Sequence, residues 1–494
     1  LPVLAALIYG AVQLHTQREL DRRVEIKIER GQGLHDQARD KTAELEGLRQ
    51  RAFAAFNSQR SEEGEALWTQ VVELAATANQ LYREASQVFE AGLVIDSSRI
   101  DVRDMLGEVL LERALAAERD HNTALRDELL ERLKIYDLDS EFSQRWTAPA
   151  RLELSSQPSG AQVVLEEYVT DENQRLQLTH TQILGETPVR VGELAPGSYR
   201  LSLSMAGRAT VHYPVALRRE EVLELDIHLP PTATIPDGFV YVPPGRFLFG
   251  SALPRSLRQQ FLSAVPIHES RTEGYLIAQH ETTYGEWIEY LDSLTPEEQV
   301  AQGITVGEGD PGGVPSLRRQ EDGSWLLTLQ PGSETYQVVP GEKIVYKSRK
   351  ARTTHDWLRL PVSGISFTEA SAYARWLDHP SRLPGARLCT DFEWERAARG
   401  ADDRLWPFGN RFSIDDANVD VTYGRQAETM GPDEVGSRPE SRSPFEVEEM
   451  AGNVLEWGVS SLKANEVIIR GSSYFYSKVS ARASNRTVGD PNFR

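Results

Sequence analysis

The N-terminal part of this chain contains no proline between Gln13 and Trp146. Proline removes a backbone donor and clashes with the preceding helical turn, so a long stretch without it favours long helices. One apolar stripe recurs there at alternating spacings of four and three, typical of a helix face close to a heptad seam. It comprises Leu67, Val71, Leu74, Ala78, Leu81, Ala85 and Val88. We predict that residues 13–146 form a helical stalk, either a coiled coil or an array of helical hairpins.

The residues before this stalk, Leu1 to Val12, form an uncharged apolar run. A full membrane span needs roughly 20 apolar residues. We therefore interpret residues 1–12 as part of a transmembrane helix followed by a polar juxtamembrane stalk. A signal-peptide remnant and a short buried helix are the alternatives.

At Ala150 the pattern changes from helical to alternating, and Gly/Pro turns separate short apolar runs. This spacing predicts a small all-β sandwich over residues 150–230. The turn Pro158-Ser159-Gly160-Ala161 resembles the Pro-Glu-Gly-Ala turn that names the PEGA domain. PEGA domains are surface-associated modules without catalysis, so the resemblance implies a spacer or a wall-contacting module.

Three capping boxes mark helix starts in the C-terminal part of the chain. They are Thr283 with Glu286, Ser366 with Glu369, and Thr390 with Glu393. In each, a hydroxyl and a glutamate three residues later satisfy free backbone donors. Helices are expected to begin at these positions.

These boxes lie inside six ordered blocks that resemble the formylglycine-generating enzyme (sulfatase-modifying factor) family. The blocks are residues 239–251, 280–283, 361–377, 387–400, 451–457 and 470–474. The resemblance implies an α+β fold related to C-type lectins over residues 237–494. It also implies an insertion at about 296–358 and a missing C-terminal strand.

The active oxidases of that family carry two cysteines just after the position of Ser473-Tyr474, and they bind copper(I). Soft thiolates are the ligands that copper(I) prefers. Here residues 475–480 contain no thiol, and Cys389 is the chain's one cysteine. We therefore assign no catalytic residues, argue against copper, and interpret Cys389 as a small buried apolar residue.

The resemblance also implies calcium, a hard cation that oxygen ligands hold. Carried over by position, the ligands are the side chains of Glu449 and Glu456 and the backbone carbonyls of Gly452 and Val454. Asn418 hints at a second site. The alternative is that these residues form only a hydrogen-bonded turn and part of the core.

By the same resemblance, a ligand face would contain aromatic and polar side chains that suit a peptide, a glycan or an envelope component. The residues are Tyr474, Phe475, Tyr476, Arg482, Asn485 and Arg486. Ordinary packing is the alternative, because aromatic side chains are mostly structural.

The formal net charge of −20 argues against nucleic acid, whose phosphates require a basic face. The order of parts resembles the extracytoplasmic half of bacterial serine/threonine kinase fusions. We expect a non-catalytic ligand-binding or sensory region, membrane-anchored, with its bulk periplasmic or extracellular. The alternatives are a sulfatase-modifying-factor-type oxidoreductase with an atypical active site and a structural envelope protein.

Overall fold

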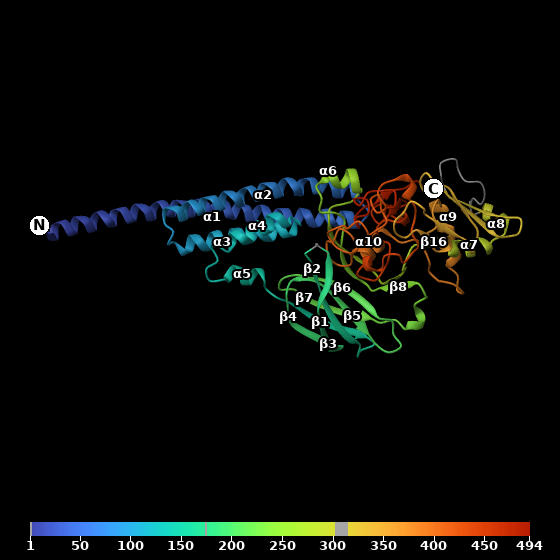
Figure 1. Cartoon of the computed structure of the whole chain (residues 1–494). Coiled ribbons are helices and arrows are strands. Elements are labelled where there is room, and N and C mark those ends of the chain that lie inside the picture. The colour runs from blue at the N-terminus through green and yellow to red at the C-terminus, as the bar shows by residue number, and fades with distance from the viewer. Residues whose placement is uncertain (1, 173–174, 302–314) are drawn as a thin grey trace. The chain divides into compact units, whose positions relative to one another are not determined.

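The computed structural model describes residues 2–172, 175–301 and 315–494. The chain divides into two compact units, residues 1–148 and 149–494, shown with their elements in Figure 1. The first unit is helical. The second contains a β-rich domain followed by a domain of short strands and helices.

The first unit contains two long helices joined by a tight turn and three shorter ones (Figure 1). They are α1 (Pro2–Asn57), α2 (Ser61–Ile95), α3 (Ile100–Arg119), α4 (Thr123–Leu133) and α5 (Glu141–Trp146). Of the predicted stripe on α2, Leu67, Val71, Ala78 and Ala85 are buried, whereas Leu74, Leu81 and Val88 are half-buried. The helices thus form packed hairpins around one apolar core.

The N-terminal turns of α1 expose large apolar side chains, including Ile8, Tyr9 and Val12. Within the part of the chain that is described, none of the helices has both the length and the apolarity that crossing a bilayer requires.

The β-rich domain contains two sheets. One has the order β4-β1-β7 and the other β3-β2-β5-β6. Their bounds are β1 (Ala150–Gln157), β2 (Gln162–Thr170), β3 (Leu176–Glu186), β4 (Val189–Leu194), β5 (Gly197–Ser204), β6 (Val211–Leu217) and β7 (Val222–His228). Alternate residues of both sheets, such as Leu152 and Leu154 of β1 and Leu201 and Leu203 of β5, share one buried core.

Ion pairs and hydrogen bonds join this domain to the C-terminal one. Arg200 of β5 binds Glu166 of its own domain and Glu446 of the C-terminal domain, with N···O distances of 3.0 and 2.6 Å. The Tyr213 hydroxyl donates to the carbonyl of Pro244 at 3.1 Å. The β-rich domain is therefore docked on its neighbour rather than separated from it by a free linker.

The C-terminal domain has low regularity, with small sheets and short helices. Its strands outside the insertion are β8 (Phe239–Val242), β9 (Gly245–Phe249), β10 (His268–Thr272), β11 (Tyr275–Ala278), β17 (Glu456–Val459), β18 (Val467–Arg470) and β19 (Thr487–Val488). Its helices are α6 (Arg255–Leu257), α7 (Tyr284–Asp292), α8 (Pro296–Ala301), α9 (Phe367–Leu377) and α10 (Asp391–Arg399). Helices α7, α9 and α10 begin at the three predicted capping boxes, and each box has both of its hydrogen bonds.

The predicted insertion adds five strands: β12 (Ser316–Arg319), β13 (Trp325–Leu329), β14 (Tyr336–Val338), β15 (Lys343–Val345) and β16 (Thr354–Asp356). Residues 302–314 of this insertion lie outside the described residues. Leu327 and Tyr346 are fully buried and share a core with Trp287 and Tyr290 of α7. The described part of the insertion is therefore packed into the domain.

Candidate functional site

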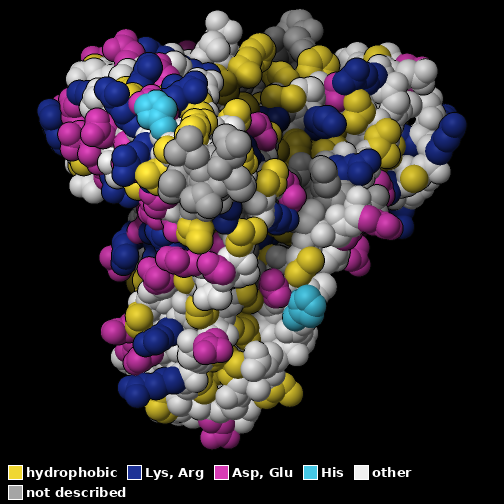
Figure 2. Space-filling view, turned by 90° about the vertical axis from the view of Figure 1, so that its left-hand side faces the viewer, with side chains coloured by type: hydrophobic (Ala, Val, Ile, Leu, Met, Phe, Trp, Pro, Cys, Tyr) yellow, Lys and Arg dark blue, Asp and Glu magenta, His cyan; other side chains and the backbone are white. Residues whose placement is uncertain are grey.

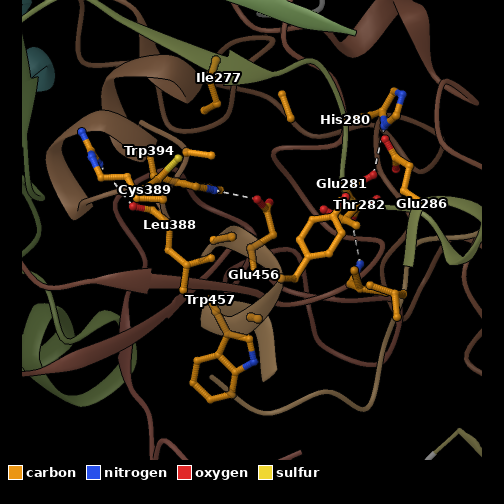
Figure 3. Close-up of a pocket in the computed structure, with 18 of the residues that line it drawn as sticks. Ile277, His280, Glu281, Thr282, Glu286, Leu388, Cys389, Trp394, Glu456 and Trp457 are labelled. Atoms are coloured by element: carbon orange, nitrogen blue, oxygen red, sulfur yellow. Dashed lines mark hydrogen bonds between the residues drawn. The ribbon is translucent and has the colours of Figure 1, made fainter. Parts of the chain in front are cut away.

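A pocket of about 900 Å³ opens in the C-terminal domain. Strands β8 and β11, helix α9, residues 383–389 and the start of β17 supply most of its walls. Figure 3 shows apolar side chains such as Ile277, Leu388 and Trp457 around it, with acidic Glu281 and Glu286 on the side away from Leu388 and Glu456 between them. A concave, largely apolar space with a few polar groups is typical of a small-molecule or peptide site.

Cys389 lines this pocket beside Trp394 (Figure 3). It is half-buried and packs against the apolar core that contains Trp394 and Met450, so it is less buried than predicted but has the predicted apolar contacts. Desolvation raises the pKa of its thiol to about 12, and the nearby carboxylates of Glu393 and Glu456 act in the same direction. Since the thiolate is the nucleophile and the metal ligand, this thiol is poorly suited to either role near neutral pH.

The segment where the active oxidases carry cysteines instead presents two aromatic rings. Phe475 and Tyr476 are exposed and meet edge to face, with ring centroids 5.8 Å apart. Tyr474 is largely buried, and desolvation raises the pKa of its hydroxyl to about 12.

The predicted ligand face does not form as a single surface. Asn485 is buried and donates to the carbonyl of Ser480 at 2.6 Å. Arg486 is buried and its Nε donates to Asp391 at 3.0 Å. Arg482 is half-buried, with its guanidinium 5.7 Å from the ring centre of Trp406. Asn485 and Arg486 thus stabilise the interior, and only the Phe475–Tyr476 pair faces solvent.

Two of the predicted calcium ligands, Glu449 and Glu456, are half-buried carboxyl groups. Glu456 accepts a hydrogen bond from the indole Nε1 of Trp394 at 3.1 Å, drawn in Figure 3. Glu449 accepts one from the backbone of Gly436 at 2.9 Å, while its Oε2 is buried without a hydrogen-bond partner in the described structure. Desolvation raises the pKa of each carboxyl to about 7.

Glu281 is a further buried carboxyl here, and nothing in its local sequence singles it out beyond its place in a family block. It accepts hydrogen bonds from Asn453 Nδ2 at 2.8 Å and from the backbone of Val454 at 3.1 Å. Desolvation raises its pKa well above the usual range, and repulsion from Glu449 and Glu456 adds to the shift. Glu449 and Glu456 therefore both disfavour the charged form of Glu281.

Carboxylate and carbonyl oxygens are the donors that a hard cation such as calcium takes. No group of three or more His, Cys, Asp and Glu side chains that could hold a metal ion is found in residues 2–172, 175–301 and 315–494. A cation near Glu449 and Glu456 would therefore need backbone carbonyls, such as those of Gly452 and Val454. Asn418 is buried nearby, and its backbone carbonyl accepts a hydrogen bond from the amide of Asn453 at 2.8 Å.

The face drawn in Figure 2 shows basic and acidic side chains interspersed, with no continuous field of one sign. On that face, nothing resembles the basic surface that binding a phosphate backbone requires.

A family model described as the sulfatase-modifying factor enzyme 1-like domain matches residues 228–494. The chain belongs to this family. A PEGA domain model matches residues 181–233, within the β-rich domain.

Three curated relatives show the range of the family. The mouse protein "Inactive C-alpha-formylglycine-generating enzyme 2" is 28% identical over 245 residues, which cover 48% of this chain and 73% of that protein. "Hercynine oxygenase" of Mycobacterium tuberculosis is 37% identical over 109 residues, covering 21% and 22%. "Serine/threonine-protein kinase pkn1" of Chlamydia caviae is 24% identical over 219 residues, covering 44% and 27%.

The chain thus spans about a quarter or less of the oxygenase and kinase relatives. Among solved structures, "Treponema denticola variable protein 1" matches with a TM-score of 0.31 and 14% identity, covering 51% of this chain and 89% of that one. The similarity extends both to a protein named inactive and to one named an oxygenase, so the chemistry of this chain must be judged from its own residues.

Proposed function

We propose that this chain is a non-catalytic binding module that keeps the sulfatase-modifying factor fold without its copper chemistry. The observation that carries the proposal is the absence of a second thiol. Cys389 is the one cysteine in the sequence, and residues 475–480 contain none. A copper(I) site needs soft thiolate ligands, and the segment that would supply them holds Phe475 and Tyr476 instead.

The binding site in this proposal is the 900 Å³ pocket, and the class of ligand is apolar. The test uses the dye 1-anilinonaphthalene-8-sulfonate, whose own emission rises when it enters an apolar site. Ala386 lines the pocket wall, so Ala386→Phe should fill the pocket and lower the emission of the directly excited dye severalfold. Ala386→Ser is the matched control and should leave the emission unchanged. Equal signals from both variants would place the dye elsewhere and contradict the pocket assignment.

The similarity to the kinase supports a sensory role. In this proposal the chain is the extracytoplasmic region of a membrane-attached bacterial protein, with a serine/threonine kinase on the cytoplasmic side. Protease added to spheroplasts of the source bacterium should digest the region, with detergent-lysed cells as the control. Protection in spheroplasts and digestion only after lysis would contradict this location.

A calcium ion near Glu449 and Glu456 is a second part of the proposal. The surplus of buried negative charge and the unpartnered Glu449 Oε2 support it. Millimolar calcium should raise the Tm of the wild type, and Glu456→Gln should abolish the shift. An unchanged wild-type Tm in millimolar calcium would refute the site.

The exposed ring of Phe475 lines the pocket and meets that of Tyr476, which favours contact of both rings with a peptide, a glycan or an envelope component. Lysozyme-released peptidoglycan fragments and unfolded peptides can be screened for binding to the wild type and to the Phe475→Ala/Tyr476→Ala variant. Equal binding of these fragments by the two proteins would show that the two rings do not form a contact surface.

The alternative function is an oxidoreductase with an atypical active site, which the similarity to hercynine oxygenase supports. It predicts oxygen-dependent turnover with added copper or iron. A structural envelope protein is the remaining alternative, and it predicts no specific ligand in the pocket.

A further inference from the structure

Arg349 of the insertion, between β15 and β16, is a buried cation with three oxygen partners. Its side chain is 0% exposed. Nε donates to the carbonyl of Thr429 at 2.7 Å, Nη2 to the carbonyl of Gly431 at 2.6 Å, and Nη1 to the carboxylate of Asp433 at 2.7 Å. All three acceptors belong to one segment of the family domain, so the insertion reaches into that domain through this guanidinium.

Two tyrosine rings contact the same guanidinium. Its carbon lies 3.7 Å from the ring centre of Tyr346 and 4.0 Å from that of Tyr423. Cation–π attraction is strongest where water is excluded, as it is around this fully buried group. Oxygens in one plane and rings beside it match the flat, forked shape of a guanidinium, which an ammonium does not share.

The acidic partner is also built into the site. Asp433 is fully buried, and its Oδ2 accepts from the Tyr423 hydroxyl at 2.8 Å and pairs with Arg438 at 2.7 Å. The backbone amide of Asp433 donates to Asn453 Oδ1 at 2.8 Å. The carboxylate is therefore held in position from several sides.

This cluster adjoins Asn418, where the sequence suggested a second calcium position. Asn418 Nδ2 donates to the carbonyl of Gly431 at 2.9 Å, and that carbonyl also accepts from Arg349. Arg349 and Asn418 thus share one carbonyl acceptor, while Asn418 Oδ1 is buried without a hydrogen-bond partner in the described residues.

We propose that residues 418–433 form a cation socket whose resident cation is the guanidinium of Arg349. The insertion supplies this cation from its own chain and so fixes the segment 418–433 without metal. The socket selects a planar guanidinium through its three oxygens and two rings. This inference is independent of the proposed ligand pocket.

Chemical rescue tests the socket. Arg349→Ala should lower the Tm of the full chain by several degrees, because it leaves Asp433 buried with one fewer cation. Methylguanidinium at low millimolar concentration should restore at least half of the loss, and methylammonium should restore little. The matched control is Arg352→Ala, which removes the Arg352–Asp415 pair where Asp415 is 62% exposed. That variant should show no rescue.

Arg349→Lys keeps the proposal testable if Arg349→Ala does not fold. This variant keeps the positive charge but lacks the planar guanidinium with its several N–H donors, so its Tm should lie clearly below that of the wild type. Protease should also cleave residues 343–356 faster than in the wild type. A lysine variant that matches the wild type in both measurements would overturn the proposal. So would the absence of methylguanidinium rescue in a folded Arg349→Ala protein.

Discussion

Individual side chains in this protein owe their charge state to burial. His268 of β10 is only 2% exposed, its Nδ1 bonds to the carbonyl of Pro266 at 2.7 Å, and its ring meets Phe249 edge to face. Desolvation lowers its pKa from 6.5 to about 4. The folded state therefore keeps this histidine neutral under mildly acidic conditions.

This neutrality predicts acid sensitivity. Between pH 6.5 and 4 the unfolded chain protonates His268 and the folded chain does not, so stability falls as the pH is lowered through that window. The stability that depends on a neutral His268 is fully present above pH 6.5, and its loss by pH 4 lowers the free energy of unfolding by about 3 kcal/mol. Urea unfolding at a series of pH values measures this effect. The free energy of unfolding should fall less between pH 6.5 and 4 for His268→Gln than for the wild type. Parallel curves would contradict this assignment.

Cys389 gives a second prediction at the residue scale. With a thiol pKa of about 12, its thiolate population at pH 8 is on the order of a thousandfold below that of a free cysteine. Ellman's reagent should react correspondingly slowly with the folded chain, and at the normal rate in denaturant. Fast reaction of the folded protein would show that the thiol is activated.

Helix packing in the first unit leaves no room for a side chain at Gly31. A Cβ at Gly31 of α1 would lie 2.4 Å from the Phe89 ring of α2, whereas a Cβ at Gly33 would meet nothing within 4 Å. Gly31→Ala should therefore destabilise the helical unit by about 1–3 kcal/mol through overpacking, despite its better helix propensity. Gly33→Ala is the matched control and should stabilise by up to about 1 kcal/mol. Urea unfolding followed by helical circular dichroism measures both, and equal stabilisation by both variants would refute the packing argument.

The sequence predicted helix starts well, because the hydrogen bonds that define them join residues close together in the chain. The capping boxes at Thr283, Ser366 and Thr390 each mark a helix start because their bonds span only three residues. The pair of Arg349 and Asp433 leaves no such pattern, since 84 residues separate its members. The pocket was missed for the same reason, because its walls come from distant segments.

At the scale of the whole molecule, the β-rich domain and the C-terminal domain share a polar interface. Arg200 is 13% exposed and links Glu166 to Glu446 across it. The sequence predicted both domains but not this contact, because no local pattern records which surfaces will meet. The family blocks did predict the C-terminal domain, since each block preserves a short local structure.

The interface predicts coupled unfolding of the two domains. Arg200→Met should weaken the interface by about 1–3 kcal/mol, because two partly buried carboxylates lose their cation. Calorimetry should then resolve the β-rich domain as a separate or broadened transition. Arg190→Met removes the exposed Arg190–Glu153 pair and should leave the profile unchanged. Identical profiles for the two variants would mean that Arg200 does not couple the domains.

The central claim is that this chain retains the fold of its family without the oxidase chemistry. The most direct measurement incubates the full chain with copper(I), oxygen and a cysteine-containing peptide, and follows the peptide by mass spectrometry. We predict no aldehyde product and no tight copper(I) binding, with Cys389→Ala behaving like the wild type. Oxygen-dependent conversion of the peptide cysteine to formylglycine by the wild-type chain would contradict the account.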